Sequence, residues 1–297
     1  MKKLKFLGIG SAFYPPFDNT SAFFTHNDDF YLIDCGESIF KKIWDLKEMK
    51  ESKNKNVAAF FDIDGTIHRN SLLIEHFKLL LKYEYINVMS WEGKVKEKFS
   101  RWENRIGDYD DYLEELVEIY VEALKNFSKA DMDFLAKRVI ELKGNKVYKY
   151  TRSRLLYHIK NGHKVIIISG SPDFLVGKMA EKYNVKNYTA SKYLTDENGI
   201  FTGEVVPMWD AGSKKKAIAE YCDKYDIDLE KSYAYGDTTG DFTMFKKVGN
   251  PVAINPAKKL LDKIKGDEEL REKAMIIVER KDVVYKLRPD MDIISDM

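Results

Sequence analysis

The chain has 297 residues, 33% of them charged, and a formal net charge of +1, so no global electrostatic field draws it to nucleic acid or to a membrane surface. Its 44% hydrophobic content can bury a substantial core, no apolar run is long enough to span a bilayer, and the N-terminus lacks the apolar segment of a signal peptide. The two cysteines, Cys35 and Cys222, are far apart in the sequence, which favours a reducing compartment. We therefore expect a cytoplasmic protein without nucleic-acid or membrane partners, and the sequence predicts no oligomeric state.

The first 48 residues predict a short β-meander rather than an α/β unit. Three β-prone runs lie at residues 4–8, 22–25 and 30–33. The segments 6–13 and 32–37 resemble the opening of the metallo-β-lactamase fold, in its ribonuclease-Z-like branch. That fold continues into a zinc-binding His-x-His-x-Asp-His segment, and the five histidines of this chain form no such cluster. We therefore expect residues 1–48 to be a fragment that takes no part in chemistry.

The most informative segment is residues 57–67, where an apolar run ends in two aspartates and a glycine turn. Such a run predicts a buried strand of a parallel sheet, and ligands of parallel sheets bind beyond the carboxyl ends of the strands. Because side chains alternate along a strand, Asp62 and Asp64 point to the same side. Two close carboxylates favour a divalent cation or a raised pKa on one of them, and oxygen ligands favour Mg²⁺. Alone, the pattern also fits a glycine turn flanked by solvated acids.

A second apolar run, at residues 165–168, ends in a hydroxyl and a flexible turn. Ser169 and Gly170 precede a helix that we expect to begin near residue 173, so the hydroxyl and the free N–H groups of the turn could bind a phosphate oxygen. Taken alone, a serine N-cap followed by proline in the first helical turn is the more frequent explanation.

Two later segments add a lysine and two more aspartates. Lys214 opens a basic triplet in a helix that we expect to run to residue 225, although such a triplet is usually a solvated helix face. Residues 232–236 predict a third strand, which is followed by Asp237 and Asp241 before the next helix.

Together these segments are similar to the four motifs of the haloacid dehalogenase superfamily. The motifs stand in order at residues 62–66, at residues 169–171, at Lys214, and at Asp237 with Asp241. Over residues 57–297 the chain resembles the phosphoserine-phosphatase-like branch of that superfamily. One motif could arise by chance, but four at successive strand ends or helix starts argue for a relationship. The resemblance implies a phosphatase with an α/β fold, in which a doubly wound parallel sheet carries a helical cap inserted after its first strand.

The resemblance also implies the chemistry of the first motif. Asp62 is the nucleophile that becomes an aspartyl phosphate, and Asp64 is the acid that protonates the leaving oxygen and later activates water. Since a carboxylate must approach an anion, the site needs positive charge. The resemblance assigns this charge to Mg²⁺ held by Asp62, the backbone carbonyl of Asp64, and Asp237.

The remaining motif residues are expected to bind phosphate or to support the site. Ser169, Gly170 and Lys214 are the phosphate-binding candidates, and the resemblance selects Lys214 over its two neighbours by its distance before the last motif. Asp241 is expected to orient Lys214 or a metal-bound water, and Thr66 is expected to support the first motif.

Two departures from the family bear on the substrate. Asp64 argues for fast hydrolysis of a phosphate ester, because dehalogenases lack an acid at this position and transport ATPases carry threonine there. Phosphoserine phosphatases carry a glutamate where this chain has Ser71, and the acidic stretch 108–118 has no evident arginine in the cap. Phosphoserine itself is therefore a doubtful substrate, and we expect another small phosphorylated metabolite.

Alternatives remain open from the sequence. A phosphotransferase of the same superfamily would pass the phosphoryl group to an acceptor other than water. A non-catalytic phosphate-binding protein conflicts with the intact set of catalytic residues. A zinc hydrolase driven by the N-terminal fragment lacks the ligands that it needs.

The expected domain organisation follows from these motifs. Residues 1–48 form the fragment, residues 49–70 and 145–297 form the core, and residues 71–144 form the cap. Met49 stands where a core plus cap of ordinary length would begin, so the fragment is either a fusion or a remnant. The other core elements that we expect are a helix, a hairpin and a final strand, at residues 145–161, 188–206 and 275–285.

Overall fold

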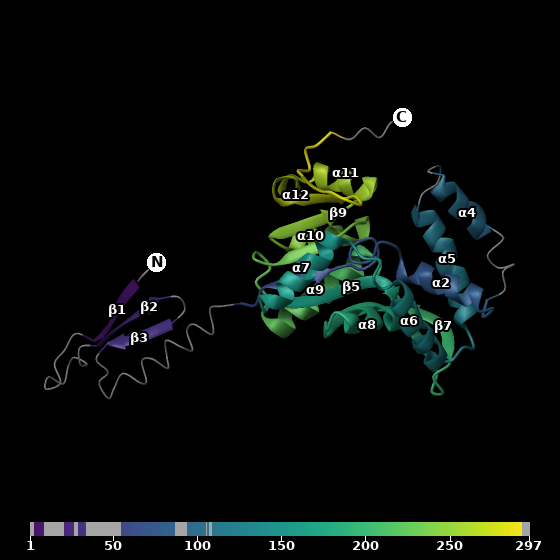
Figure 1. Ribbon diagram of the computed structural model, residues 1–297, viewed down its shortest axis with the longest axis horizontal. Coiled ribbons are helices and arrows are strands. Elements are labelled where there is room, and N and C mark those ends of the chain that lie inside the picture. Colours follow the sequence, from purple (N-terminus) through teal and green to yellow (C-terminus); the bar gives the residue numbers. More distant parts are fainter. Residues whose placement is uncertain are drawn as a thin grey trace. The chain divides into compact units, whose positions relative to one another are not determined.

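The computed structural model describes residues 3–8, 21–26, 29–33, 55–86, 94–104, 106 and 109–292 (Figure 1). The chain divides into two units, Met1–Lys55 and Asn56–Met297. The described part of the first unit is an antiparallel sheet of three strands, β1 (Lys3–Gly8), β2 (Ser21–His26) and β3 (Asp29–Ile33). The predicted β-meander is thus confirmed. Cys35 and Met49 lie outside the described residues.

The second unit is built around an eight-stranded sheet in the order β11-β10-β9-β8-β4-β5-β6-β7. Its strands are β4 (Ala58–Phe61), β5 (Lys164–Pro172), β6 (Asn187–Thr195), β7 (Phe201–Val206), β8 (Tyr233–Gly236), β9 (Asn250–Ile254), β10 (Met275–Glu279) and β11 (Val284–Leu287). Neighbouring strands from β10 to β6 are parallel, and only the edge strands β7 and β11 run antiparallel to their neighbours. The predicted doubly wound α/β sheet is confirmed, with β4 at its centre.

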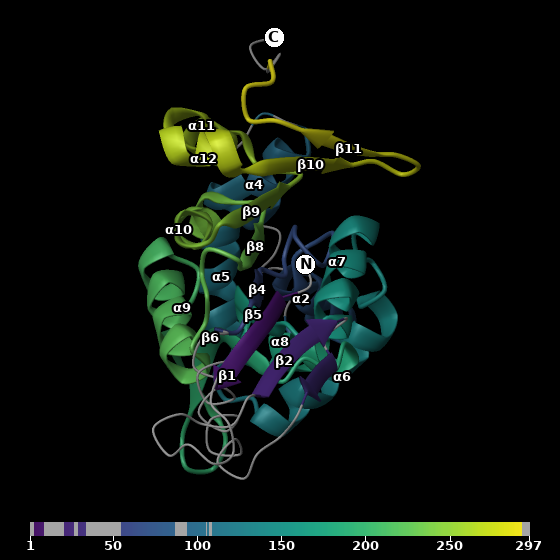
Figure 2. The same cartoon turned by 90° about the vertical axis from the view of Figure 1, so that its left-hand side faces the viewer.

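Helices cover both faces of this sheet (Figure 2). Those of the core are α7 (Lys149–Lys160), α8 (Asp173–Lys182), α9 (Ala211–Tyr225), α10 (Phe242–Lys247), α11 (Lys258–Gly266) and α12 (Glu268–Lys273). Alternation along β4 feeds two separate cores, because Phe61 packs with residues of α7 and α8 whereas Phe60 packs with residues of α9 to α12. Both phenylalanines are fully buried. The strand that leads to Asp62 is therefore held from both sides.

Within the described residues, four helices lie between β4 and α7, where the periodicity predicted helices. They are α2 (Leu72–Lys82), α4 (Lys94–Glu103), α5 (Tyr109–Leu124) and α6 (Lys129–Lys143). In Figure 1, α2, α4 and α5 lie together to the right of the sheet and the core helices. Backbone hydrogen bonds join the α5–α6 connection to the β6–β7 hairpin, from Phe201 to Phe127 and from Lys129 to Gly199. The inserted helices are thereby fastened to the core.

The C-terminal region differs from the single strand predicted over residues 275–285. The backbone N–H of Arg280 donates to the carbonyl of Val283, and this turn divides the segment into the antiparallel hairpin β10–β11. The helix predicted from residue 145 begins at Lys149 and ends at its predicted stop, Asn161. None of the described helices combines the length and the apolar character needed to cross a bilayer.

Candidate functional site

The parallel pairing of β4 with β8 brings the first and last motifs together. Asp62 follows β4 directly, and its backbone N–H donates to the carbonyl of Tyr235 on β8 at 3.0 Å. Asp237 follows β8, and Asp241 lies one short turn further along the chain. Each of these three aspartates offers a carboxylate oxygen that lies within 4.8 Å of the others. We refer to Asp62, Asp237 and Asp241 as the carboxylate cluster.

A buried lysine lies inside the carboxylate cluster. The Nζ atom of Lys214 donates to Oδ1 of Asp62 at 2.8 Å and to Oδ1 of Asp241 at 2.6 Å. Its side chain is 4% exposed, whereas Lys215 and Lys216 are exposed. Asp210 caps the first turn of α9 by accepting from the N–H groups of two following residues, and so fixes the start of the helix that carries Lys214.

The electrostatics of the cluster leave it short of positive charge. Burial raises the pKa of Asp62 to about 7, although the charge of Lys214 opposes this shift. Burial and the charges of Asp62 and Asp241 raise the pKa of Asp237 well above its usual range. Burial opposes the charge of Lys214, but the two carboxylates that it contacts outweigh burial and raise its pKa. Three carboxylates around one ammonium group form a hard oxygen donor set that fits a divalent cation such as Mg²⁺.

The turn after β4 packs against the carboxylate of Asp237. Gly65 has φ +74°, and a Cβ atom built there would stand 1.9 Å from Oδ2 of Asp237. A side chain at this position would displace the carboxylate, so glycine is required by both the backbone and the space. Next to it, the hydroxyl of buried Thr66 donates to Oδ1 of Asp237 at 3.1 Å.

Asp241 joins the last motif to Lys214. While its Oδ1 accepts from Lys214, its Oδ2 accepts from the backbone N–H groups of Asp237 at 3.0 Å and of Thr238 at 3.1 Å. The side chain is fully buried. A single carboxylate therefore fixes both the loop that presents Asp237 and the ammonium group beside Asp62.

Asp64 has a different environment from the carboxylate cluster. Its Oδ2 accepts from Ser171 at 2.6 Å and from Ser71 at 3.1 Å, and its Oδ1 accepts from the backbone N–H of Leu72 at 2.9 Å. Leu72 is the first residue of α2, so the carboxylate lies at a helix N-terminus. Burial nevertheless raises the pKa of Asp64 against these hydrogen bonds. The side chain is thus fixed in direction and disposed to hold a proton.

The second motif lies beside Asp64. Ser169 is fully buried and its hydroxyl accepts from the N–H of Ser171, while the carbonyl of Gly170 accepts from Ser191. Gly170 packs against Trp209, since a Cβ atom there would stand 2.9 Å from the Cβ of the tryptophan. Within this motif, the hydroxyl that contacts Asp64 belongs to Ser171.

Five of the eight candidate residues from the sequence therefore lie together. The other three form their hydrogen bonds with neighbouring segments. One continuous chain of hydrogen bonds runs from Asp62 through Lys214, Asp241 and Asp237 to Thr66. Asp64 is turned toward α2 and the second motif, and Ser169 and Gly170 bond within their own turn and to β6. Sequence reasoning missed Ser171, although strand alternation offered a signal, because residues two apart share a side.

Comparison with known proteins gives a consistent result. A protein-family model described as haloacid dehalogenase-like hydrolase matches residues 59–246. A phosphoserine phosphatase of Methanocaldococcus jannaschii is 27% identical over 233 residues, which cover 78% of this chain and 96% of that protein. A histidinol-phosphatase of Neisseria meningitidis is 22% identical over 233 residues, which cover 75% and 98%. The inhibition of morphological differentiation protein of Streptomyces azureus is 26% identical over 217 residues, which cover 72% and 77%.

Solved structures share the fold. A protein of unknown function from Bordetella pertussis superposes with a TM-score of 0.57 at 15% identity, over 76% of this chain and 99% of that one. A phospho-aspartyl intermediate analogue of phosphoserine phosphatase superposes with a TM-score of 0.52 at 21% identity, over 77% and 96%. At these identities the likeness concerns the architecture of the second unit.

Removal of the buried ammonium group should destabilise the protein strongly. We expect Lys214→Met to lower the free energy of unfolding by about 3–5 kcal/mol, because Asp62 and Asp241 would be left as uncompensated buried charges. Urea unfolding followed by circular dichroism would measure this. Lys215→Met, one residue further along the same helix but exposed, is the matched control and should change stability by less than about 0.5 kcal/mol. Equal effects of the two changes would contradict the described geometry.

Asp237 should make the metal-free protein less stable at high pH. Because its pKa is raised in the folded state, the folded protein holds a proton more tightly than the unfolded chain, and the resulting stability is lost as pH rises above the usual aspartate range and through the raised pKa. We expect Asp237→Asn to raise the melting temperature at pH 8 in the presence of EDTA by about 2 °C or more, and to have a smaller effect at pH 4. Thermal unfolding at the two pH values measures the difference. A larger gain at pH 4 than at pH 8 would contradict the assigned sign.

Proposed function

The chain belongs to the haloacid dehalogenase-like hydrolases, the family indicated by its four sequence motifs, and on this basis we propose that it is a Mg²⁺-dependent phosphomonoesterase acting through an aspartyl phosphate on Asp62. The proposal rests on two aspartates that lie at the end of one central strand and have different hydrogen-bond partners. Asp62 is hydrogen-bonded to a buried ammonium group, and Asp64 is held separately with a raised pKa. Such a pair supplies a nucleophile and an acid side by side.

The environment of Asp62 supports its role as the nucleophile. Lys214 binds Oδ1, so Oδ2 is the oxygen left to attack phosphorus. In the first step Asp62 forms a bond to phosphorus while the ester P–O bond breaks, and in the second step water displaces Asp62 and phosphate leaves. Lys214 then offsets charge on the phosphoryl oxygens, together with N–H groups of the turn at Ser169 and Gly170.

Asp64 is the proposed proton carrier for both steps. The raised pKa favours its protonated form, which can give a proton to the leaving alkoxide oxygen. The resulting carboxylate then takes a proton from the attacking water. Ser171 and the N-terminus of α2 hold the side chain in one orientation throughout, so the same group serves as acid and as base.

Mg²⁺ is the proposed cofactor. Asp62, Asp237 and the backbone carbonyl of Asp64 would hold it, and Asp241 would keep Asp237 and Lys214 in place. When bound, the ion offsets the negative charge of the cluster and polarises a phosphoryl oxygen. Thr66 fixes the Asp237 carboxylate on the side facing the first motif.

The proposed substrate is a small phosphorylated metabolite, selected by the inserted helices. Residues 71–144 would act as a cap over the site, since α2 starts at the Asp64 carboxylate and continues away from the sheet. Ser71, which stands where phosphoserine phosphatases carry glutamate, is bonded to Asp64 rather than directed at a substrate amino group. We propose no catalytic part for residues 1–48.

The first test is phosphate release from a panel of phosphomonoesters with and without Mg²⁺. We expect release by the unmodified protein with Mg²⁺, and a loss of roughly 1,000-fold or more in Asp62→Asn, because the amide cannot form the phosphoenzyme. Asp223→Asn, an exposed aspartate on α9, is the matched control and should retain full activity. Unchanged turnover in Asp62→Asn would refute the mechanism. Transfer of phosphate to an added alcohol in preference to water would favour a phosphotransferase.

Asp64→Asn should have an effect that depends on the leaving group. We expect kcat to fall by roughly 100- to 10,000-fold for alkyl phosphates, which need a proton on the leaving oxygen, and much less for p-nitrophenyl phosphate in the first step. Because the same residue activates water, the aspartyl phosphate should accumulate with the activated ester. Quenched-flow trapping of acid-stable phosphoprotein would measure this. An equal loss for both esters with no trapped phosphoprotein would remove the acid–base role.

A further inference from the structure

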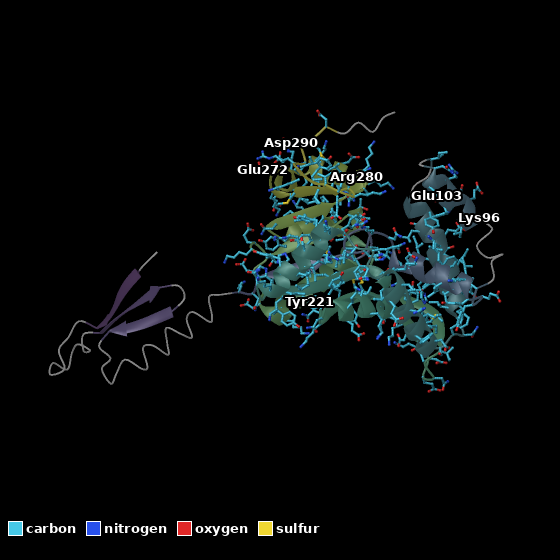
Figure 3. All side chains as sticks on the ribbon, viewed as in Figure 1. Lys96, Glu103, Tyr221, Glu272, Arg280 and Asp290 are labelled. Atoms are coloured by element: carbon cyan, nitrogen blue, oxygen red, sulfur yellow. The ribbon has the colours of Figure 1, made fainter. Side chains whose placement is uncertain are left out.

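A cavity lies next to the turn that follows the first motif. It has a volume of about 490 Å³ and is lined by Arg69, Tyr148, Glu279, Arg280, Lys281 and Asp282. These residues come from three segments: the turn that follows the first motif, the start of α7, and the turn between β10 and β11. Figure 3 labels Arg280 at the last of these, and Figure 2 shows the β10–β11 hairpin projecting from the sheet.

The wall of this cavity is fastened to the catalytic residues. Arg69 stands three residues after Thr66, and the backbone N–H of Tyr148 donates to the carbonyl of Ile67 at 3.0 Å. Thr151, which is buried on α7, donates to the carbonyl of Thr66 at 2.7 Å and so joins α7 to the first motif. Burial and the charge of Asp237 raise the pKa of Tyr148, so the phenol that lines the cavity also lies within the field of the carboxylate cluster.

A second connection joins the cavity to Asp237, which follows β8. The backbone N–H of Ala257 donates to the carbonyl of Asp237 at 2.8 Å, and the side-chain oxygen of Asn255 accepts from the N–H of Glu279 at 2.9 Å. The loop after β9 therefore lies between Asp237 and the cavity. Hydrogen bonds of this loop thus connect the segment that carries Asp237 to the segment that lines the cavity.

The charge of the cavity favours an anion. Glu279 is 4% exposed on its side chain, and its carboxylate accepts from the N–H groups of Lys149 and Tyr150 at 2.8 Å each, so it serves as the cap of α7. Oε1 of Glu279 also forms an ion pair with Nη2 of Arg69 at 3.7 Å. Arg69 is half-exposed, and its Nε donates to the carbonyl of Val147, which directs the outer guanidinium nitrogens away from the backbone.

The remaining cationic groups come from the hairpin turn. Arg280 and Lys281 are exposed, and neither forms an ion pair within the described part of the chain. Three cationic side chains, those of Arg69, Arg280 and Lys281, therefore line the cavity with two carboxylates, those of Glu279 and Asp282, which leaves an excess of positive charge. Guanidinium groups in such a setting bind carboxylate or phosphate oxygens through paired N–H donors.

We propose that this cavity binds a second anionic group of the substrate, a carboxylate or phosphate remote from the ester that is hydrolysed. The inference rests on the proposed phosphatase function and names the class of substrate: phosphomonoesters whose alcohol carries an acidic group.

The test compares two esters that differ by one acidic group, 3-phosphoglycerate and glycerol 3-phosphate. The double variant Arg280→Ala/Lys281→Ala should raise KM for 3-phosphoglycerate about 10-fold with kcat unchanged, and should alter KM for glycerol 3-phosphate less than 2-fold. Lys286→Ala, an exposed lysine on β11 that does not line the cavity, is the matched control. Asp282→Asn should lower KM for 3-phosphoglycerate, a gain that misfolding cannot produce. Fructose 1,6-bisphosphate against glucose 6-phosphate repeats the comparison for a second phosphate.

Binding measured without turnover separates this inference from the proposed function. Calorimetric titration of both esters into Asp62→Asn with Mg²⁺ should show tighter binding of the acidic ester, reduced about 10-fold by the double change. If this holds while the unmodified protein hydrolyses no ester, the phosphatase proposal fails and the anion site stands. Equal losses for both esters, no preference for the acidic one, or no binding of either would overturn the anion site.

Discussion

The active end of this protein depends on one buried arrangement, an ammonium group held between two carboxylates with a third close by. Lys214 donates to Asp62 and Asp241, and Asp237 shares the same space. Burying three acids without compensation would cost several kcal/mol for each ion. Part of this cost is compensated by the ammonium group, the two backbone N–H donors to Asp241, and the hydroxyl of Thr66. A divalent cation could neutralise the negative charge that these groups leave uncompensated.

The separation of Asp62 from Asp64 follows from chain geometry. Both point to one side of the strand end, yet Asp62 is directed toward α9 and the last motif, and Asp64 toward α2 and the second motif. One intervening residue, fully buried Ile63, anchors the turn between them, because its carbonyl accepts from the N–H groups of Thr66, Ile67 and His68. Two like residues thereby acquire different hydrogen-bond partners over a distance of two positions.

The sequence was most informative where chemistry and strand ends coincide. The three apolar runs and the alternation of β4 follow from local patterns, since buried strands and their carboxyl ends have characteristic residues. The preference for Lys214 followed from the family resemblance, because a basic triplet alone is usually a solvated helix face. The partners of Asp64 were harder to predict, because Ser71 and Ser171 reach it only through the tertiary fold. The β10–β11 turn at Arg280 and the capping of α7 by Glu279 were missed entirely. Both depend on contacts between distant segments, and exposed polar residues carry no periodic signal.

The order of the strands has a consequence for how the protein is made. β4 occupies the centre of the sheet but is synthesised before both of its neighbours, and Lys214 follows Asp62 by 152 residues. Until β8 has emerged from the ribosome, the central strand has an open edge and its aspartate has no ammonium partner. Closing such long loops is slow compared with forming local helices. The nascent chain must therefore carry an incomplete, acid-bearing strand through most of its synthesis, and a chaperone that shields β4 would act at the most vulnerable stage of folding.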